Sequence, residues 1–167
     1  WAGQGQVLEP LISEMLADPY FSQVAPKSTG QDYFNLAWLE RFELNAYRAE
    51  DVQRSLLELT ARSIASEINT ADCRTVYLSG GGYHNTLLVQ RLKDLMPQAN
   101  LYSSDALGVD PDFMEAMAFA WLAKQCLDGK YSGLPEVTGA VSPRILGVVF
   151  PRPSPYFLAA SRISTTS

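Results

Sequence analysis

The chain has 167 residues and a formal net charge of −5, from 13 basic and 18 acidic side chains. A composition of 47% hydrophobic and 19% charged residues is that of one globular domain and excludes a disordered chain. The acidic balance and the scattered basic residues exclude an electrostatic surface for nucleic acid, and no apolar run is long enough to span a membrane.

The cysteines and the chain start bear on the setting of the protein. Cys73 and Cys126 lie far apart and predict neither a disulfide framework nor a zinc site, and we expect no other metal site. Reduced thiols are the simplest interpretation, so we expect a cytoplasmic protein. The chain begins at Trp1 without an initiator methionine or a leader, which suggests a piece of something longer.

Apolar side chains at helical spacing predict three helices in the first 70 residues, over residues 6–17, 34–42 and 51–68. Asp18-Pro19 should end the first helix, because the residue before a proline disfavours helical geometry. The third helix is the longest periodic segment of the chain. We therefore expect the first half of the protein to be helical.

A polar loop over residues 26–32 connects the first two predicted helices, between aromatic pairs that should hold it to the core. The loop either presents Lys27, Ser28 and Thr29 to a ligand or is a surface turn before a helix N-cap. Its composition alone favours the surface turn.

A run of three glycines, Gly80, Gly81 and Gly82, separates the apolar stretch 75–78 from an amphipathic stretch that begins at Asn85. This pattern predicts strand, glycine turn and helix, with Asn85 as the N-cap. Without Cβ atoms the backbone can lie directly against a ligand, and the helix start adds N–H groups and the positive end of a dipole. The turn is either a nucleotide or anion cradle or a tight turn needed only for packing.

A second strand is predicted at residues 100–103, and the short helical crossover between the strands favours a parallel pair. Ser103-Ser104-Asp105 then lies at the carboxyl end of that strand, on the same side as the glycine turn, where ligands collect in open α/β sheets. The fold class is therefore α/β.

The last helix is predicted over residues 111–127, with Asp110 as its N-cap. Its apolar residues cover nearly the whole circumference, so we expect a central helix that packs on more than one side. Glu115 in its first turn is either a helix-start acid or a functional carboxylate. A final strand is expected at 144–150, followed by an irregular tail over 151–167.

Several of these junctions together resemble one family, the anhydro-N-acetylmuramic acid kinases of the sugar kinase, heat-shock protein and actin superfamily. The match is to the C-terminal half of such an enzyme. The matching segments occur in the family's order: Pro26-Lys27-Ser28-Thr29-Gly30, Phe34-Asn35, Gly80-Gly81-Gly82, His84-Asn85, Asp112, Glu115-Ala116, Ala118-Phe119-Ala120, Leu134-Pro135 and Thr138-Gly139-Ala140.

The resemblance implies an actin-like ATPase lobe of the ribonuclease H type, with a short mixed sheet flanked by helices. Residues 1–150 would form the C-terminal lobe of a two-lobe sugar kinase. The implied reaction uses ATP and Mg²⁺ to open and phosphorylate 1,6-anhydro-N-acetylmuramic acid, giving N-acetylmuramic acid 6-phosphate in cell-wall recycling. The implied partners are ATP, the amino sugar and an N-terminal lobe, and a homodimer is a further expectation.

The resemblance also implies roles for particular residues. The glycines Gly80, Gly81 and Gly82 would contact the nucleotide together with Asn85. The segment Lys27, Ser28 and Thr29 would form a loop near the cleft, and Glu115 would face the sugar. The family's catalytic aspartate and first phosphate loop lie upstream of the matched region, so we expect no catalytic residue in this chain and no activity from it alone.

Departures from the family and other readings of the residues leave alternatives open. Tyr83 stands where the family usually has a small residue, and it could stack on a base or obstruct it; Gln31 replaces a commonly basic residue. A different class of function is a binding or oligomerisation module without chemistry. A third is nucleophilic catalysis by His84, the only histidine, with Cys73 or a serine.

Overall fold

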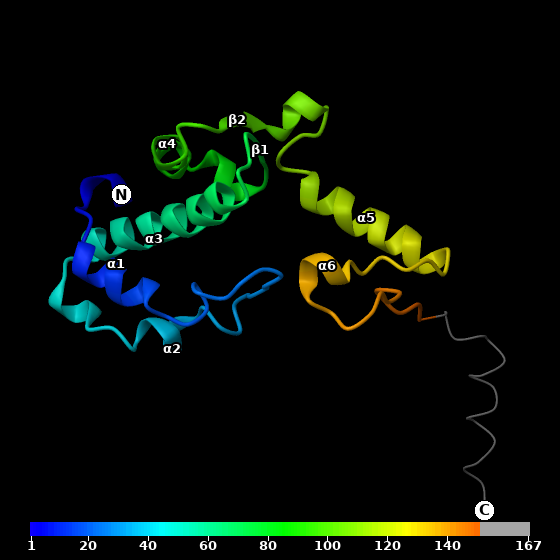
Figure 1. Cartoon of the computed structure of the whole chain (residues 1–167), viewed down its shortest axis with the longest axis horizontal. Helices are drawn as coiled ribbons and strands as arrows, with labels where there is room; N and C mark the ends of the chain where they lie inside the picture. The colour runs from blue at the N-terminus through cyan, green and yellow to red at the C-terminus, as the bar shows by residue number, and fades with distance from the viewer. Residues whose placement is uncertain (151–167) are drawn as a thin grey trace, which may run out of the picture.

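The long helix α3 (Ala49–Thr70) is the centre of the computed structural model, which describes residues 1–150 (Figure 1). The other helices are α1 (Glu9–Leu16), α2 (Leu36–Leu39), α4 (Thr86–Leu95), α5 (Met114–Leu127) and α6 (Pro135–Thr138). The strands are β1 (Thr75–Leu78) and β2 (Asn100–Ser103), and single 3-10 turns occupy Ala2–Gln4, Leu44–Ala46, Gly81–His84 and Ser104–Leu107. The predicted helices and the first two predicted strands are confirmed within a few residues.

Helix α3 packs on two sides, and each side has its own apolar cluster. On one side Leu59 meets α1 and the α2 region, in a cluster with Leu11, Met15, Trp38 and Phe42. On the other side Ala61 and Ala65 meet α4 in a cluster with Leu92 and Met96. The small alanine side chains allow α4 to approach α3 closely. Helix α3 thus separates the α1–α2 layer from the layer of α4 and the sheet (Figure 1).

The sheet is a pair of parallel strands joined by α4, as predicted, with Leu78 opposite Ser103. One of its faces packs toward α4 through Leu78 and Leu101. On the other face Tyr77 and Tyr102 are 44% and 46% exposed, with ring centroids 5.8 Å apart. Over residues 1–150 the sheet contains these two strands, so the expected mixed sheet is corrected to a two-stranded parallel one.

The strand expected at residues 144–150 is absent from the described part of the chain. This segment instead runs back along the end of α5: the N–H groups of Ser132 and Gly133 donate to the Arg144 carbonyl at 3.1 and 3.2 Å. Gly147 has a φ of 111° and lies against Cys126. Apolar composition made the segment look like a strand, but a strand needs a partner strand to bond. The expected tail over 151–167 lies outside the described residues.

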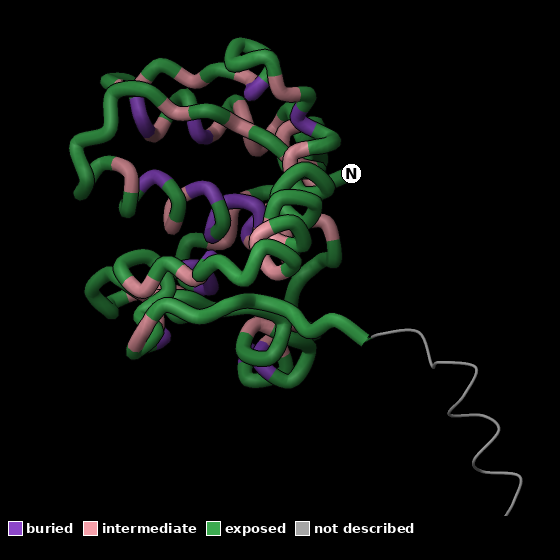
Figure 2. The backbone as a smooth tube through the Cα atoms, turned by 90° about the vertical axis from the view of Figure 1, so that its right-hand side faces the viewer, coloured by how far each residue is buried: buried purple, intermediate pink, exposed green. Residues whose placement is uncertain are grey.

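Helix α5 differs most from expectation. It begins at Met114, and Asp110 does not cap it: the Asp110 carboxylate accepts from the Asp112 N–H at 2.9 Å in the preceding turn. The expectation of a central, packed helix is wrong, because no residue of α5 is buried. In the described chain after Ser104, burial is confined to Pro111 and Ser132 (Figure 2). Within residues 1–150 most of the large apolar side chains of α5 are exposed, among them Met117, Phe119 and Trp121.

Candidate functional site

The glycine turn has the predicted strand, turn and helix geometry. Gly80 adopts a φ of 73°, in the left-handed region that favours glycine, and Gly81–His84 form one 3-10 turn. Asn85 caps α4 as expected, since its Oδ1 accepts from the Leu88 N–H at 3.1 Å. A Cβ atom added at Gly80 or Gly81 would meet no atom within 4 Å. The backbone of the turn therefore faces open space.

The electrostatics of this turn suit an anion or a phosphate. The first N–H groups of a helical turn have no acceptor inside that turn, and the start of α4 adds the positive end of its dipole. Because β1 and β2 are parallel, the glycine turn and Ser104 follow the same edge of the sheet. Ser104 is fully buried, and within residues 1–150 its hydroxyl has no hydrogen-bond partner.

Two contacts join the glycine turn to the loop that leads into α5. The Gly80 N–H donates to the Pro111 carbonyl at 2.8 Å. His84 Nε2 lies 2.6 Å from Asp112 Oδ1, and both side chains are more than half exposed. Sequence reasoning missed this pair, although both residues were among the segments that carried the resemblance. The pair brings Glu115, exposed in the first turn of α5, to the same end of the molecule as the turn.

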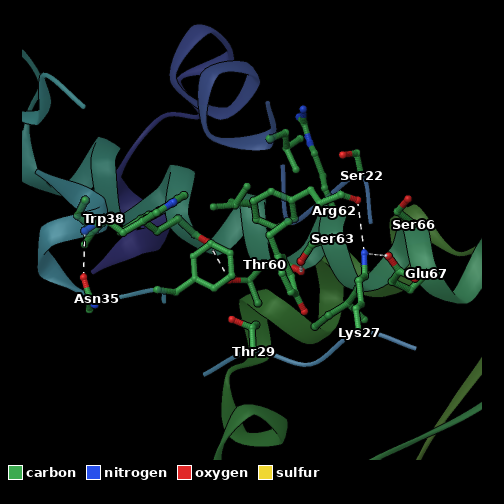
Figure 3. Close-up of a pocket in the computed structure, with 18 of the residues that line it drawn as sticks. Ser22, Lys27, Thr29, Asn35, Trp38, Thr60, Arg62, Ser63, Ser66 and Glu67 are labelled. Atoms are coloured by element: carbon green, nitrogen blue, oxygen red, sulfur yellow. Dashed lines mark hydrogen bonds and ion pairs between the residues drawn. The ribbon is translucent and has the colours of Figure 1, made fainter. Parts of the chain in front are cut away.

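The predicted Lys27 loop lies at a different place, along a groove between α3 and the α2 region (Figure 3). Lys27 Nζ is 2.6 Å from the Glu67 carboxylate and 3.4 Å from the Phe21 carbonyl, and its side chain is mostly buried. Thr29 lines the same groove, which has a volume of about 1270 Å³. Ser28 lines a smaller hollow of about 550 Å³ beside Tyr20 and Tyr33. No pattern in the sequence predicted this groove.

The predicted site residues therefore form two groups. Gly80, Gly81, Gly82, Asn85 and Glu115 are grouped near the sheet edge by the contacts just described. The Lys27 loop lies on the other side of α3 (Figure 1), and a Cβ at Gly139, just after α6, would lie 3.6 Å from the Pro26 carbonyl oxygen. In the described chain, two segments of the resemblance thus meet each other there rather than at the glycine turn.

Asp18 holds together residues on one side of this groove. Its buried carboxylate accepts from the Tyr33 hydroxyl at 2.7 Å, from Trp38 Nε1 at 2.9 Å and from Arg41 at 3.0 Å. Burial alone would raise the pKa of Asp18, but these hydrogen bonds and one from the Tyr20 N–H hold the pKa well below its ordinary value. The residue expected only to end a helix thus ties both aromatic pairs to α1 and α2.

A second buried carboxylate, Glu58, holds α4 against α3. It accepts from Arg91 on α4 at 2.7 and 2.8 Å and from Arg62 at 2.8 Å. Arg62 also reaches Glu9 on α1 at 2.6 and 2.8 Å. The Arg91 hydrogen bond lowers the pKa of Glu58 to about 2, against the opposing effect of burial. This network fixes the helix that carries the glycine turn at its start.

Two further observations concern metals and membranes. Among residues 1–150, no three or more His, Cys, Asp or Glu side chains are grouped so that they could hold a metal ion. None of the described helices combines the length and the apolar character that crossing a membrane requires.

Comparison with known proteins identifies the family. Residues 1–152 match the family model of anhydro-N-acetylmuramic acid kinase. Proteins named anhydro-N-acetylmuramic acid kinase from Pseudomonas putida, Pseudomonas fluorescens and Pseudomonas syringae pv. tomato are 49%, 47% and 46% identical over 155 residues. Each match covers 90% of this chain and 43% of the relative, so the chain spans less than half the length of these relatives. The chain belongs to the anhydro-N-acetylmuramic acid kinase family.

Proposed function

We propose that residues 1–150 are the C-terminal, nucleotide-binding lobe of a two-lobe kinase with an actin-like ATPase fold. The whole enzyme adds water across the anhydro bond of 1,6-anhydro-N-acetylmuramic acid and phosphorylates it to N-acetylmuramic acid 6-phosphate, in the cytoplasm. The observation that carries this proposal is the open glycine turn at the carboxyl edge of two parallel strands, in a chain of this family.

The turn fits a nucleotide because its backbone is unobstructed. With open space at Gly80 and Gly81, a phosphate or ribose can lie directly against peptide groups. Asn85 holds the first turn of α4 in place by its capping bond and so keeps N–H groups directed toward that space. Tyr83 is half-buried, with its ring edge-on to His84 at 5.5 Å, which leaves the approach to Gly81 open.

The other lobe would supply the groups that this chain lacks. When bound, ATP would supply the phosphoryl group and Mg²⁺ would neutralise the charge of its phosphates. The two lobes would position the nucleotide and the sugar for the transfer. Glu115 would face the sugar from the start of α5. Lys27, Ser28 and Thr29 would line the approach to the cleft. The ion pair of Lys27 with Glu67 would hold this loop against α3. The chain alone is inactive under this proposal.

The test uses the full-length protein that carries this chain, titrated calorimetrically with ATP and Mg²⁺. A Cβ at Gly81 meets no atom, so Gly81→Val should fold normally yet fill the space that the nucleotide needs. We expect at least tenfold weaker ATP binding and slower sugar phosphorylation. The control is Gly3→Ala, whose added Cβ makes only ordinary contact with Leu87 at 3.8 Å. No ATP binding by the wild type, or unchanged turnover in Gly81→Val, would contradict the proposal.

A second candidate function is a binding or oligomerisation module, and the exposed apolar face of α5 favours it. The two candidates differ in how assembly responds to ligand. A module of this kind would form a stable complex of the full-length protein that light scattering finds unchanged by ATP. A kinase lobe uses the same face within one enzyme molecule, and its ligand affinity depends on the glycine turn.

A further inference from the structure

We propose that the His84–Asp112 pair is a positioning contact that holds the glycine turn and the start of α5 in one fixed arrangement. The inference rests on the proposed function, because it assigns these residues to nucleotide binding. Neither side chain needs to touch the nucleotide. They hold the glycine turn, which binds the nucleotide, in a fixed position relative to α5, which carries Glu115.

The loop on the Asp112 side is built to hold this carboxylate still. The Asp112 N–H donates to Asp110 Oδ1 at 2.9 Å, and the Phe113 N–H donates to the Asp110 carbonyl at 3.1 Å. Pro111 between them is buried, and its carbonyl accepts the Gly80 N–H at 2.8 Å. Asp112 is thus presented from a closed turn that is itself bonded to the glycine turn.

The glycine turn supplies the other half of the contact. His84 ends the 3-10 turn and precedes Asn85, the N-cap of α4. Its Nε2 donates to Asp112 Oδ1 at 2.6 Å, across 28 residues of sequence. The side-chain contact at His84 and the backbone contact at Gly80 therefore fasten the glycine turn at both ends. A turn rich in glycine needs such fastening, because glycine backbones are the most free to move.

The consequence for α5 follows from its burial. No residue of α5 is buried, so side-chain packing within residues 1–150 does little to fix where the helix begins. Glu115 follows Asp112 by three residues, so the His84–Asp112 contact and the Gly80–Pro111 hydrogen bond set its position relative to the glycine turn. With the pair formed, the distance between a nucleotide on the turn and a sugar near Glu115 would stay constant.

The test compares His84→Ala and His84→Gln in the full-length kinase, by steady-state kinetics with ATP varied. Both members of the pair are exposed, so their contribution to global stability is small. We expect His84→Ala to raise the KM for ATP about fivefold with kcat changed less than twofold and the melting temperature unchanged. Glutamine keeps a donor near the position of Nε2, so His84→Gln should recover most of the affinity.

Two further variants complete the experiment. If His84 and Asp112 act through one contact, the double variant with Asp112→Ala should lose no more affinity than either single variant. Lys124→Ala removes a comparable exposed ion pair with Asp128 further along α5 and should leave the KM unchanged. Additive losses, or an unchanged KM in His84→Ala, would overturn the inference. Absence of ATP binding by the wild type would instead defeat the proposed function.

Discussion

The two long helices of the molecule, α3 and α5, show that the hydrophobicity of a segment does not by itself decide whether the segment is buried. Helix α3 has many charged residues, yet it buries Ser55, Leu57, Glu58, Leu59, Ala61 and Ala65. Helix α5 is far more apolar, yet it buries none, and Phe119 and Trp121 are 64% and 51% exposed. Local sequence patterns predict that each segment is a helix. Burial depends on whether neighbouring elements are present to cover it.

The difference divides the described chain into a packed part, residues 1–104, and a mostly uncovered part, residues 105–150. Under the proposed function, the remainder of a longer enzyme covers the second part, since the chain spans 43% of its relatives. Exposed apolar surface of this extent is typical of an interface. The two parts should then respond differently to the same perturbation.

The largest difference should appear in hydrogen exchange of the chain by itself. Opening the middle of α3 disrupts apolar clusters on two sides, whereas α5 contributes no residue to either cluster. We expect amides in the middle of α3 to exchange at least about a hundredfold more slowly than those of α5. Mass spectrometry of peptic peptides measures this. Equal protection of the two helices would contradict the division.

Two methionines offer a matched comparison of the same parts. Met15 in α1 is 0% exposed and Met117 in α5 is 53% exposed. Met15→Ala leaves a cavity in the core and should lower the free energy of unfolding by about 3 kcal/mol. Met117→Ala should change it by less than about 0.5 kcal/mol. Urea denaturation of both variants gives the comparison, and similar losses would show that α5 is packed in solution.

Glu58 should contribute a smaller, pH-dependent share of the packed part's stability. The pKa of Glu58 is lowered to about 2 from an ordinary 4.5, so the stabilisation is complete above pH 4.5 and is lost as pH falls toward 2. Because Arg62 and Arg91 keep some exposure and can hydrate, Glu58→Gln should cost about 2 kcal/mol at pH 7.

The same measurement tests the sign of the pH effect. Unfolding free energies of the wild type and of Glu58→Gln should converge as pH is lowered from 5 to 2, since the protonated carboxyl no longer pairs with either arginine. The control is Glu14→Gln, an exposed position on α1, which should stay within about 0.5 kcal/mol of the wild type. A constant gap at every pH would exclude the ion pairs as its cause.

Local patterns were enough to predict the elements that carry the site. The helix expected at residues 51–68 is Ala49–Thr70, and the strand at 75–78, the glycine turn and the Asn85 cap lie where expected. Each of these depends on neighbours within a few positions along the chain. Periodicity, glycine and a capping side chain are visible at that range.

Contacts between distant residues could not be predicted in this way. Arg91 reaches Glu58 across 33 residues, and Trp38 reaches Asp18 across 20. Nothing near Glu58 distinguishes it from the solvated acids on the same helix. For the same reason the contact of His84 in the glycine turn with Asp112, 28 residues away, could not be predicted. The roles assigned to Lys27, Ser28, Thr29 and Glu115 stay predictions.

Polar substitutions on α5 should also have little effect on the stability of this chain. In this chain, Phe119→Ser with Trp121→Ser removes exposed apolar surface and should change the unfolding free energy by less than about 1 kcal/mol. It should also reduce self-association in light scattering, because these exposed apolar side chains are free to contact other copies. Ala123→Ser, an exposed position on the same helix, controls for helix propensity. In the full-length enzyme the double variant should cost several times more, since the same side chains would be covered there. Equal changes in unfolding free energy in both proteins would mean that α5 is exposed to solvent in the whole enzyme too.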